Sequence, residues 1–235
     1  AVGAVDYGRY MADSIVKDRG FPLKRGNERA AVIAEMGNIK WNFLSGTDEE
    51  VQNVATLFPG RSNVLKGTQA SERALKEMDK RGELKNYRYL LFSTHGLYVP
   101  SQPELSSILL RPDDTPSNGR YEYNGYITVG EWMGYHLNSD LVYLSACESG
   151  LGKFQAGEGI VGIPYGLTIA GNKSTIMSLW NIGDRFAADF TTEFFARLSQ
   201  GKTPKTALNE TKREYMSDRR YGNPSVWSAF LLYGE

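Results

Sequence analysis

Residues 141–150 read LVYLSACESG, an apolar run that ends in the only cysteine of the chain and continues into polar residues and glycine. Residues 89–96 read YLLFSTHG and have the same form, with a histidine in the place of the cysteine. Runs that are apolar at consecutive positions are typical of strands buried on both faces of a parallel sheet. The two stretches therefore predict two central strands of an α/β sheet.

The flanking sequence extends this sheet. Further strand patterns occur at residues 1–7, 63–65, 174–180 and 225–232, and the two central strands are expected at 89–94 and 141–146. Helical patterns lie between them. Thr47 and Glu50 have the spacing of a capping box, Asp184 is placed to cap a helix through residue 198, and Thr203 is placed to cap the next helix. Alternating strands and helices predict a mostly parallel sheet covered on both faces.

The domain organisation is simple. Residues 96–128 carry four prolines and few periodic apolar positions, which favours a long loop or a short hairpin. No internal repeat or linker divides the chain, so we expect one α/β domain over residues 1–235. The chain starts in the middle of a strand pattern and without a methionine, which suggests a fragment of a longer protein.

Composition excludes several classes of function. Among 235 residues, 27 basic side chains balance 27 acidic ones, whereas nucleic-acid binding needs clustered positive charge. No apolar run approaches the roughly 20 residues of a membrane span. A single cysteine rules out an internal disulfide framework and a multi-cysteine zinc site, and it fits a reducing compartment such as the cytoplasm.

Two ligand-binding motifs and a metal site are not supported by their sequence surroundings. Residues 157–162 read GEGIVG and match a dinucleotide-binding spacing, but the preceding strand ends ten residues too early, which favours glycines for close helix packing. Residues 196–203 loosely resemble a phosphate-binding loop, but capping explains their glycine and threonine. The only histidines, His95 and His136, lack carboxylate pairs at ligand spacing. We expect no metal and no cofactor.

The placement of His95 and Cys147 points to nucleophilic chemistry. Each directly follows an apolar run, so both are expected at the carboxyl-terminal edge of the sheet, where α/β proteins bind ligands. An imidazole there can take the proton of a thiol, and the thiolate is the stronger nucleophile. The alternative is structural: free cysteines are often inert core residues, and the histidine beside Gly96 could cap a turn. His136 is expected at the surface.

At this point the sequence resembles a known family, the CHAT domain. The resemblance rests on five blocks in family order: residues 87–96 (YRYLLFSTHG), 141–150 (LVYLSACESG), 157–162 (GEGIVG), 178–184 (SLWNIGD) and 227–230 (WSAF). That family belongs to the caspase-like cysteine peptidases and is often joined to TPR repeats. The resemblance implies a caspase-like three-layer αβα sandwich with a six-stranded sheet, in which the strand at 225–232 is an antiparallel edge. Ser149 and residues 163–165 depart from the usual family pattern.

The resemblance also assigns roles. His95 becomes the general base and Cys147 the nucleophile, and the backbone N–H groups of Gly96 and Cys147 become the oxyanion hole. Ser145, two residues before the cysteine, matches a position that lines the first substrate pocket. Trp180 is a second pocket candidate, and Asp184 either supplies a pocket acid or caps its helix.

The sequence therefore predicts a cysteine endopeptidase that cleaves a protein partner once an upstream TPR or regulatory module releases it. We expect no direct contact with nucleic acid or membrane. One alternative is a CHAT-like scaffold or signalling module with an idle dyad. Another is a cysteine hydrolase or transferase acting on small molecules, which would need a closed apolar pocket rather than an open groove.

Overall fold

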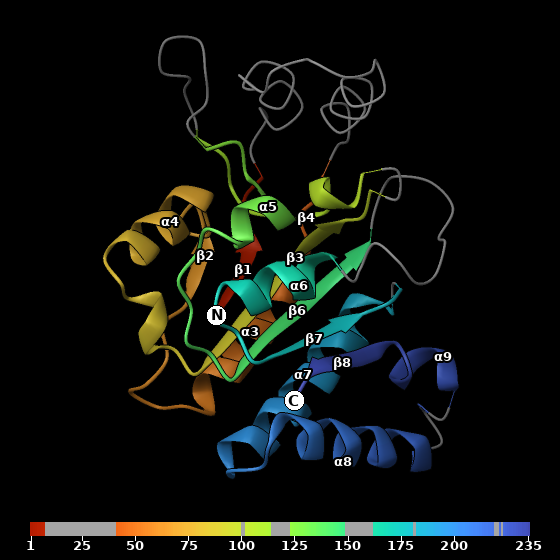
Figure 1. Ribbon diagram of the computed structural model, residues 1–235. Helices are drawn as coiled ribbons and strands as arrows, with labels where there is room; N and C mark the ends of the chain where they lie inside the picture. The colour runs from red at the N-terminus through yellow and green to blue at the C-terminus, as the bar shows by residue number, and fades with distance from the viewer. Residues whose placement is uncertain are drawn as a thin grey trace, which may run out of the picture.

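The structure is a computed structural model that describes residues 1–7, 41–99, 102–113, 123–148, 162–180, 182–218, 221 and 223–235 (Figure 1). Its strands are β1 (Val2–Val5), β2 (Leu65–Gly67), β3 (Tyr89–Leu97), β4 (Ser107–Leu109), β5 (Tyr126–Thr128), β6 (Leu141–Glu148), β7 (Ser174–Ser178) and β8 (Phe230–Gly234). Its helices are α3 (Gly46–Thr56), α4 (Glu72–Lys80), α5 (Val129–Trp132), α6 (Gly162–Ile169), α7 (Asp184–Ser199), α8 (Pro204–Ser217) and α9 (Pro224–Trp227). Two short 3-10 turns, Leu84–Asn86 and Pro103–Leu105, complete the described elements.

The sheet confirms the predicted α/β fold. Within the described part of the chain, its main path runs β2-β1-β3-β6-β7-β8. The pairs β1/β2, β1/β3, β3/β6 and β6/β7 are parallel, and β8 lies antiparallel against β7 at the edge. β4 and β5 lie off this path, because β4 pairs with the end of β3 and β5 pairs with β4. In the described residues the sheet therefore has eight strands: the six of the main path, mostly parallel with an antiparallel edge strand, match the expectation, and β4 and β5 are additional to it.

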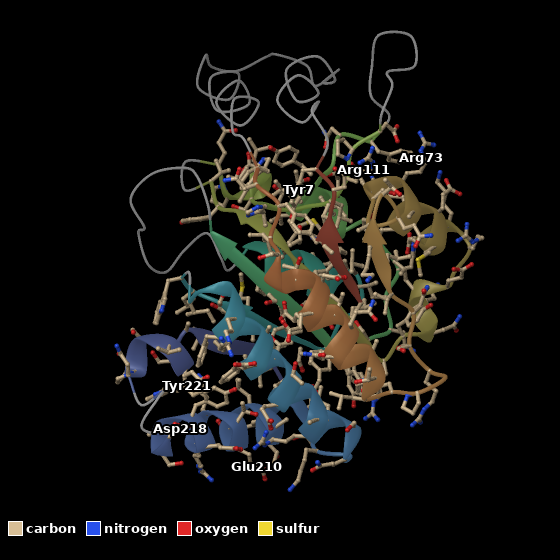
Figure 2. The ribbon with its side chains drawn as sticks, turned by 180° about the vertical axis from the view of Figure 1, so that it is seen from behind. Tyr7, Arg73, Arg111, Glu210, Asp218 and Tyr221 are labelled. Atoms are coloured by element: carbon tan, nitrogen blue, oxygen red, sulfur yellow. The ribbon has the colours of Figure 1, made fainter. Side chains whose placement is uncertain are left out.

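Helices cover both faces of the sheet, which explains the unbroken apolar runs of its central strands. Leu90 and Phe92 of β3 belong to one core together with residues of α4, α5 and α6, whereas Leu91 belongs to the other core, with α3, α7 and α8. Figure 1 shows α5 and α6 in front of the sheet, and Figure 2 shows α3 and α7 on the opposite face. Successive strand residues point to opposite faces, so a strand covered on both sides must be apolar throughout.

Two helices begin with side-chain caps, and the cap at Thr203 confirms the expected one. The Ser71 hydroxyl accepts the N–H of Ala74 at 3.1 Å, so Ser71 caps α4. The Thr203 hydroxyl accepts the N–H of Thr206 at 3.2 Å, and Pro204 occupies the first turn of α8. Both caps use a local side chain to satisfy an N–H group that the helix leaves open.

Two other expected caps are wrong. Helix α3 begins before Thr47, whose hydroxyl instead accepts the N–H of Ala4 from β1 at 2.9 Å. The Glu50 carboxylate accepts the hydroxyl of Ser93 on β3. Long-range partners in the sheet therefore replace the local capping box. The cap of α7 is Gly183, and Asp184 is the first residue inside that helix.

The expected strand at 225–232 is correct only in its second half. Asn223 caps the short helix α9 through the N–H of Ser225, and Pro224 starts that helix, so β8 begins only at Phe230. Phe230 is fully buried and stacks on Phe190 of α7, with ring centroids 4.1 Å apart. Asparagine followed by proline is a common sequence signal for the start of a helix, and the predicted strand did not take it into account.

The proline-rich segment between β3 and α5 contains a hairpin-like pair, one of the two expected forms. Ser107, Ile108 and Leu109 of β4 pair antiparallel with residues 126–128 of β5. β4 in turn pairs with Gly96 and Leu97 at the end of β3. This β4–β5 pair is called the hairpin below. It is joined by backbone pairing to the end of β3, the strand that carries His95.

Candidate active site

The candidate site lies where β3 and β6 approach their carboxyl-terminal ends. The two strands pair in parallel from Tyr89 and Leu141 onward, and this register sets His95 directly opposite Cys147. Adjacent strands are about 4.8 Å apart, so the two backbones are immediate neighbours here. The expected neighbouring positions are confirmed. Both strands continue further than predicted, to Leu97 and Glu148, so neither residue lies beyond its strand.

The imidazole of His95 is held between two aromatic rings. His95 is 5% exposed. The Tyr7 ring lies 5.1 Å from it between centroids at an interplanar angle of 47°, and the Trp41 ring lies 4.9 Å away at 44°. These rings come from the segment after β1 and the segment before α3. Tilted rings at such distances are favourable aromatic contacts and restrict rotation of the imidazole.

A backbone carbonyl sets the tautomer of His95. Its Nε2 lies 2.7 Å from the carbonyl oxygen of Asn42. A carbonyl oxygen only accepts hydrogen bonds, so Nε2 carries the proton and Nδ1 of the neutral ring is the acceptor nitrogen. This tautomer leaves the ring able to take a proton at Nδ1, as a general base requires.

Tyr7 also fixes the backbone that carries the imidazole. Its hydroxyl oxygen accepts the N–H of His95 at 3.2 Å and forms a hydrogen bond of 2.9 Å with the Thr94 hydroxyl. Burial raises the pKa of Tyr7 to about 12, so the hydroxyl stays protonated at neutral pH. Arg111, which is near Tyr7 in Figure 2, binds the backbone carbonyl of Asp6 at 3.2 Å and its carboxylate at 2.5 Å. Arg111 thereby fixes the segment directly after β1, which contains the tyrosine that contacts His95.

A bulge in β1 brings this strand into close contact with α3. Ala4 has a φ of 49°, and the pairing register with β2 shifts between Gly3 and Val5. The N–H of Ala4 therefore turns toward the Thr47 hydroxyl of α3. A Cβ on Gly3 would lie 2.6 Å from Val51 Cγ1, which explains why glycine occupies this close contact between β1 and α3.

Below the row of His95 and Cys147, two serines lie opposite one another. Ser93 pairs in register with Ser145, and both are buried. The Ser93 hydroxyl donates to the Glu50 carboxylate, which is 2% exposed. Ser145 thus lies two residues from the cysteine on the same strand and pairs with another serine. Sequence reasoning missed Glu50 because it was assigned to a helix cap.

A comparison with known protein families identifies the family of the chain. The model of the CHAT domain family matches residues 9–235, nearly the whole chain. The chain belongs to the CHAT family. This family is related to the caspase-like cysteine peptidases, and the mixed α/β fold with its mostly parallel sheet is consistent with that relationship. No curated protein matches the chain.

The remaining pocket candidates of this CHAT domain lie one strand further on. Trp180 follows β7, the other neighbour of β6, and its indole N–H donates to the carbonyl oxygen of Ser225 at 2.6 Å. Trp180 therefore ties the end of β7 to α9. Asp184 begins α7 and is not its cap, so one of its two expected roles is excluded. Its role as a pocket acid stays a prediction, as do the pocket roles of Trp180 and Ser145.

The other sequence features take structural roles. The side chain of His136 is 66% exposed, as expected, and its Nδ1 lies 3.2 Å from Asp79. Most of the glycine motif at 157–162 lies outside the described residues, as does Ser149. Its last member, Gly162, starts α6, and a Cβ there would lie 3.2 Å from Val129 Cγ2, which supports close helix packing. Gly201 has a φ of 87° just after α7, as a helix-ending glycine does.

A cavity of about 360 Å³ lies away from the candidate site, at the opposite, amino-terminal edge of the sheet. Phe58, Tyr89 and Phe195 form its aromatic wall. Its described lining contains no histidine, cysteine or carboxylate, so it lacks a candidate base or nucleophile.

Two further searches cover only the described residues. They contain no group of three or more His, Cys, Asp or Glu side chains arranged to hold a metal ion. In the same part of the chain, every helix is too short or too polar to cross a bilayer.

Proposed function

We propose that this CHAT domain is a cysteine endopeptidase in which His95 is the general base and Cys147 the nucleophile. The register that sets the two residues opposite one another on β3 and β6 supports this role most strongly. The carbonyl of Asn42 adds to the support, because it leaves Nδ1 as the basic nitrogen of His95. The family relationship to cysteine peptidases points the same way.

The proposed reaction follows acyl-transfer chemistry. Nδ1 of His95 takes the proton of the Cys147 thiol, and the thiolate attacks the scissile carbonyl carbon. The N–H groups of Gly96 and Cys147 stabilise the oxygen that gains charge in the tetrahedral intermediate. The C–N bond breaks as His95 gives its proton to the leaving amine. Water then attacks the thioester, releases the new carboxylic acid and restores the thiol.

The substrate is proposed to be an extended protein segment, and Ser145, Trp180 and Asp184 are the residues proposed to line its pocket. The proposal includes an upstream TPR or regulatory module that controls cleavage. A reducing location such as the cytoplasm fits the single cysteine.

A peptide-library cleavage profile tests the proposal. The protein at its full natural length is compared with its Cys147→Ala variant, and we expect the variant to lose about 10³-fold or more of the cleavage rate. Thermal unfolding should show that the variant keeps its fold. Equal cleavage by the folded variant, or no cleavage of any library member or whole-cell protein by the wild type, would contradict the proposal.

A further inference from the structure

The Trp41 side chain is connected to an element distant in sequence from it. Its indole N–H donates to the hydroxyl of Tyr126 at 2.8 Å. Tyr126 is fully buried on β5, and burial raises the pKa of its hydroxyl, so the phenol stays neutral. The ring that contacts His95 is therefore tethered to the hairpin by a single hydrogen bond between neutral groups.

The hairpin is also linked to His95 through backbone pairing. β5 pairs with β4, and β4 pairs with Gly96, the residue directly after His95. Backbone pairing thus ties the hairpin to the strand of the base, while Tyr126 ties it to the ring packed on the base. A shift of Tyr126 relative to β3 would move Trp41 against the imidazole.

Trp41 is also adjacent in the chain to the residue whose hydrogen bond selects the tautomer of His95. Asn42, whose carbonyl oxygen lies 2.7 Å from Nε2 of His95, is the next residue in the chain. A displacement of Trp41 would therefore also disturb the backbone that leads to this carbonyl. The hydrogen bond that Trp41 donates to Tyr126 therefore holds the ring that packs on the imidazole, and this ring is one residue from the carbonyl that sets the tautomer.

We infer that Trp41 is a positioning residue for His95, and that Tyr126 on the hairpin holds Trp41 in its working position. The inference rests on the proposed function for its effect on cleavage, but not for its effect on the histidine itself. Neither residue exchanges a proton with the substrate. Their contribution is to keep the imidazole of His95 in one orientation, and misplacement of a reacting group by about 1 Å can lower a rate by roughly 100-fold.

A double-mutant cycle tests the inference through kinetics. Tyr126→Phe deletes the acceptor of the hydrogen bond and Trp41→Phe deletes its donor while keeping an aromatic ring. We expect each variant to lower kcat by about 10-fold with KM nearly unchanged, because substrate binding does not use these groups. The double variant should be no slower than the slower single variant, since the bond can be deleted only once. Independent, multiplicative losses would overturn the inference, as would unchanged kcat in both variants.

Nitrogen-15 NMR of the imidazoles gives a readout that needs no activity. The chain has only two histidines, so a His136→Gln variant assigns the spectrum. In the catalytically dead Cys147→Ala background, we expect His95 to show one tautomer protonated at Nε2. Adding Tyr126→Phe or Trp41→Phe should produce a mixture of tautomers. An unchanged spectrum would overturn the inference even if the protein is a peptidase, and a changed one would support it even if cleavage is never found.

A matched control separates positioning from general loss of packing. Tyr143 on β6 is also fully buried, and its hydroxyl lies 3.1 Å from that of Thr191. Tyr143→Phe should lower the melting temperature to a similar degree as Tyr126→Phe, but leave kcat and the His95 spectrum as in the wild type. If Tyr143→Phe produced the same kinetic and spectral changes, the effect of Tyr126 would be one of stability, and the inference would fail.

Discussion

The two histidines of the chain are held in opposite ways. His95 is 5% exposed, and side chains or carbonyls from the segment after β1 and the segment before α3 contact its ring. The side chain of His136 is 66% exposed, and Asp79 of α4 is the partner of its ring and of its backbone N–H. A buried ring with a fixed tautomer suits proton transfer. An exposed ring beside one largely buried carboxylate, which is 13% exposed, has no comparable constraint.

The largest expected effect separates the two histidines directly. His95→Asn should lower kcat/KM for peptide cleavage by about 10²–10⁴-fold, the usual contribution of a general base. His136→Asn should stay within about two-fold of the wild type, because its surroundings are solvent and one carboxylate. Steady-state kinetics on the best library peptide checks both variants. Similar losses for both would remove the functional distinction between the histidines.

Helix α4 contacts both His136, through Asp79, and the hairpin, through Glu72. Its buried Glu72 predicts that the stability of the protein depends on pH. Its Glu72 is 1% exposed, binds Lys76 at 2.7 Å, and accepts the N–H of Gly125 next to β5 at 2.7 Å. Burial, together with the charge of Glu131, raises the pKa of Glu72 from 4.5 to about 7. Between these values the folded state binds more protons than the unfolded state, so stability falls as pH rises.

Glu72→Gln tests this dependence. The contribution of Glu72 should be present below about pH 4.5 and lost as pH rises through about 7, with a change on the order of 3 kcal/mol. Urea unfolding of wild type and variant between pH 4.5 and 8 measures it. The difference in unfolding free energy between wild type and variant should change across this pH interval. A difference that stays constant would contradict the raised pKa of Glu72.

Tyr7→Phe should lower the unfolding free energy by less than the change expected for Glu72. The substitution leaves the buried N–H of His95 without its hydroxyl acceptor and removes one partner of the Thr94 hydroxyl, which still donates to the Leu109 carbonyl. Each such loss costs about 1–3 kcal/mol of unfolding free energy. Chemical denaturation checks the value. A change below about 0.5 kcal/mol would show that this hydroxyl does not hold the base.

The smallest effect is expected at the other histidine. Asp79→Asn removes the charge beside the exposed His136 but keeps an oxygen able to accept its N–H. We expect a change of less than about 1 kcal/mol in unfolding free energy and no change in cleavage kinetics. A larger loss than that of Tyr7→Phe would reverse the ranking of the two regions.

The sequence predicted the parts of the site that depend on local pattern. The apolar runs before His95 and Cys147 identified two buried parallel strands, and the carboxyl-terminal position on both brought the residues together. It did not predict Tyr7, Trp41 or Asn42 as partners of His95. These come from segments 53 or more residues away, and nothing in a local pattern says which distant ring will pack on an imidazole.

The same reason explains the errors at helix ends. Thr47 and Glu50 have the spacing of a capping box, yet a bulge in β1 offers the threonine an N–H and β3 offers the glutamate a hydroxyl. Tertiary hydrogen bonds therefore replaced local ones. The miss at α9 is different, since Asn223 before Pro224 is a local signal that could have been found from the sequence.

Alkylation of the single cysteine tests most directly whether His95 activates Cys147. With one cysteine in the chain, the rate of iodoacetamide labelling at neutral pH reports this thiol alone. We predict fast labelling in the wild type, slowed about 10-fold or more by His95→Asn and unchanged by His136→Asn, because the thiolate is the reactive form. Equal rates in wild type and His95→Asn would contradict the account.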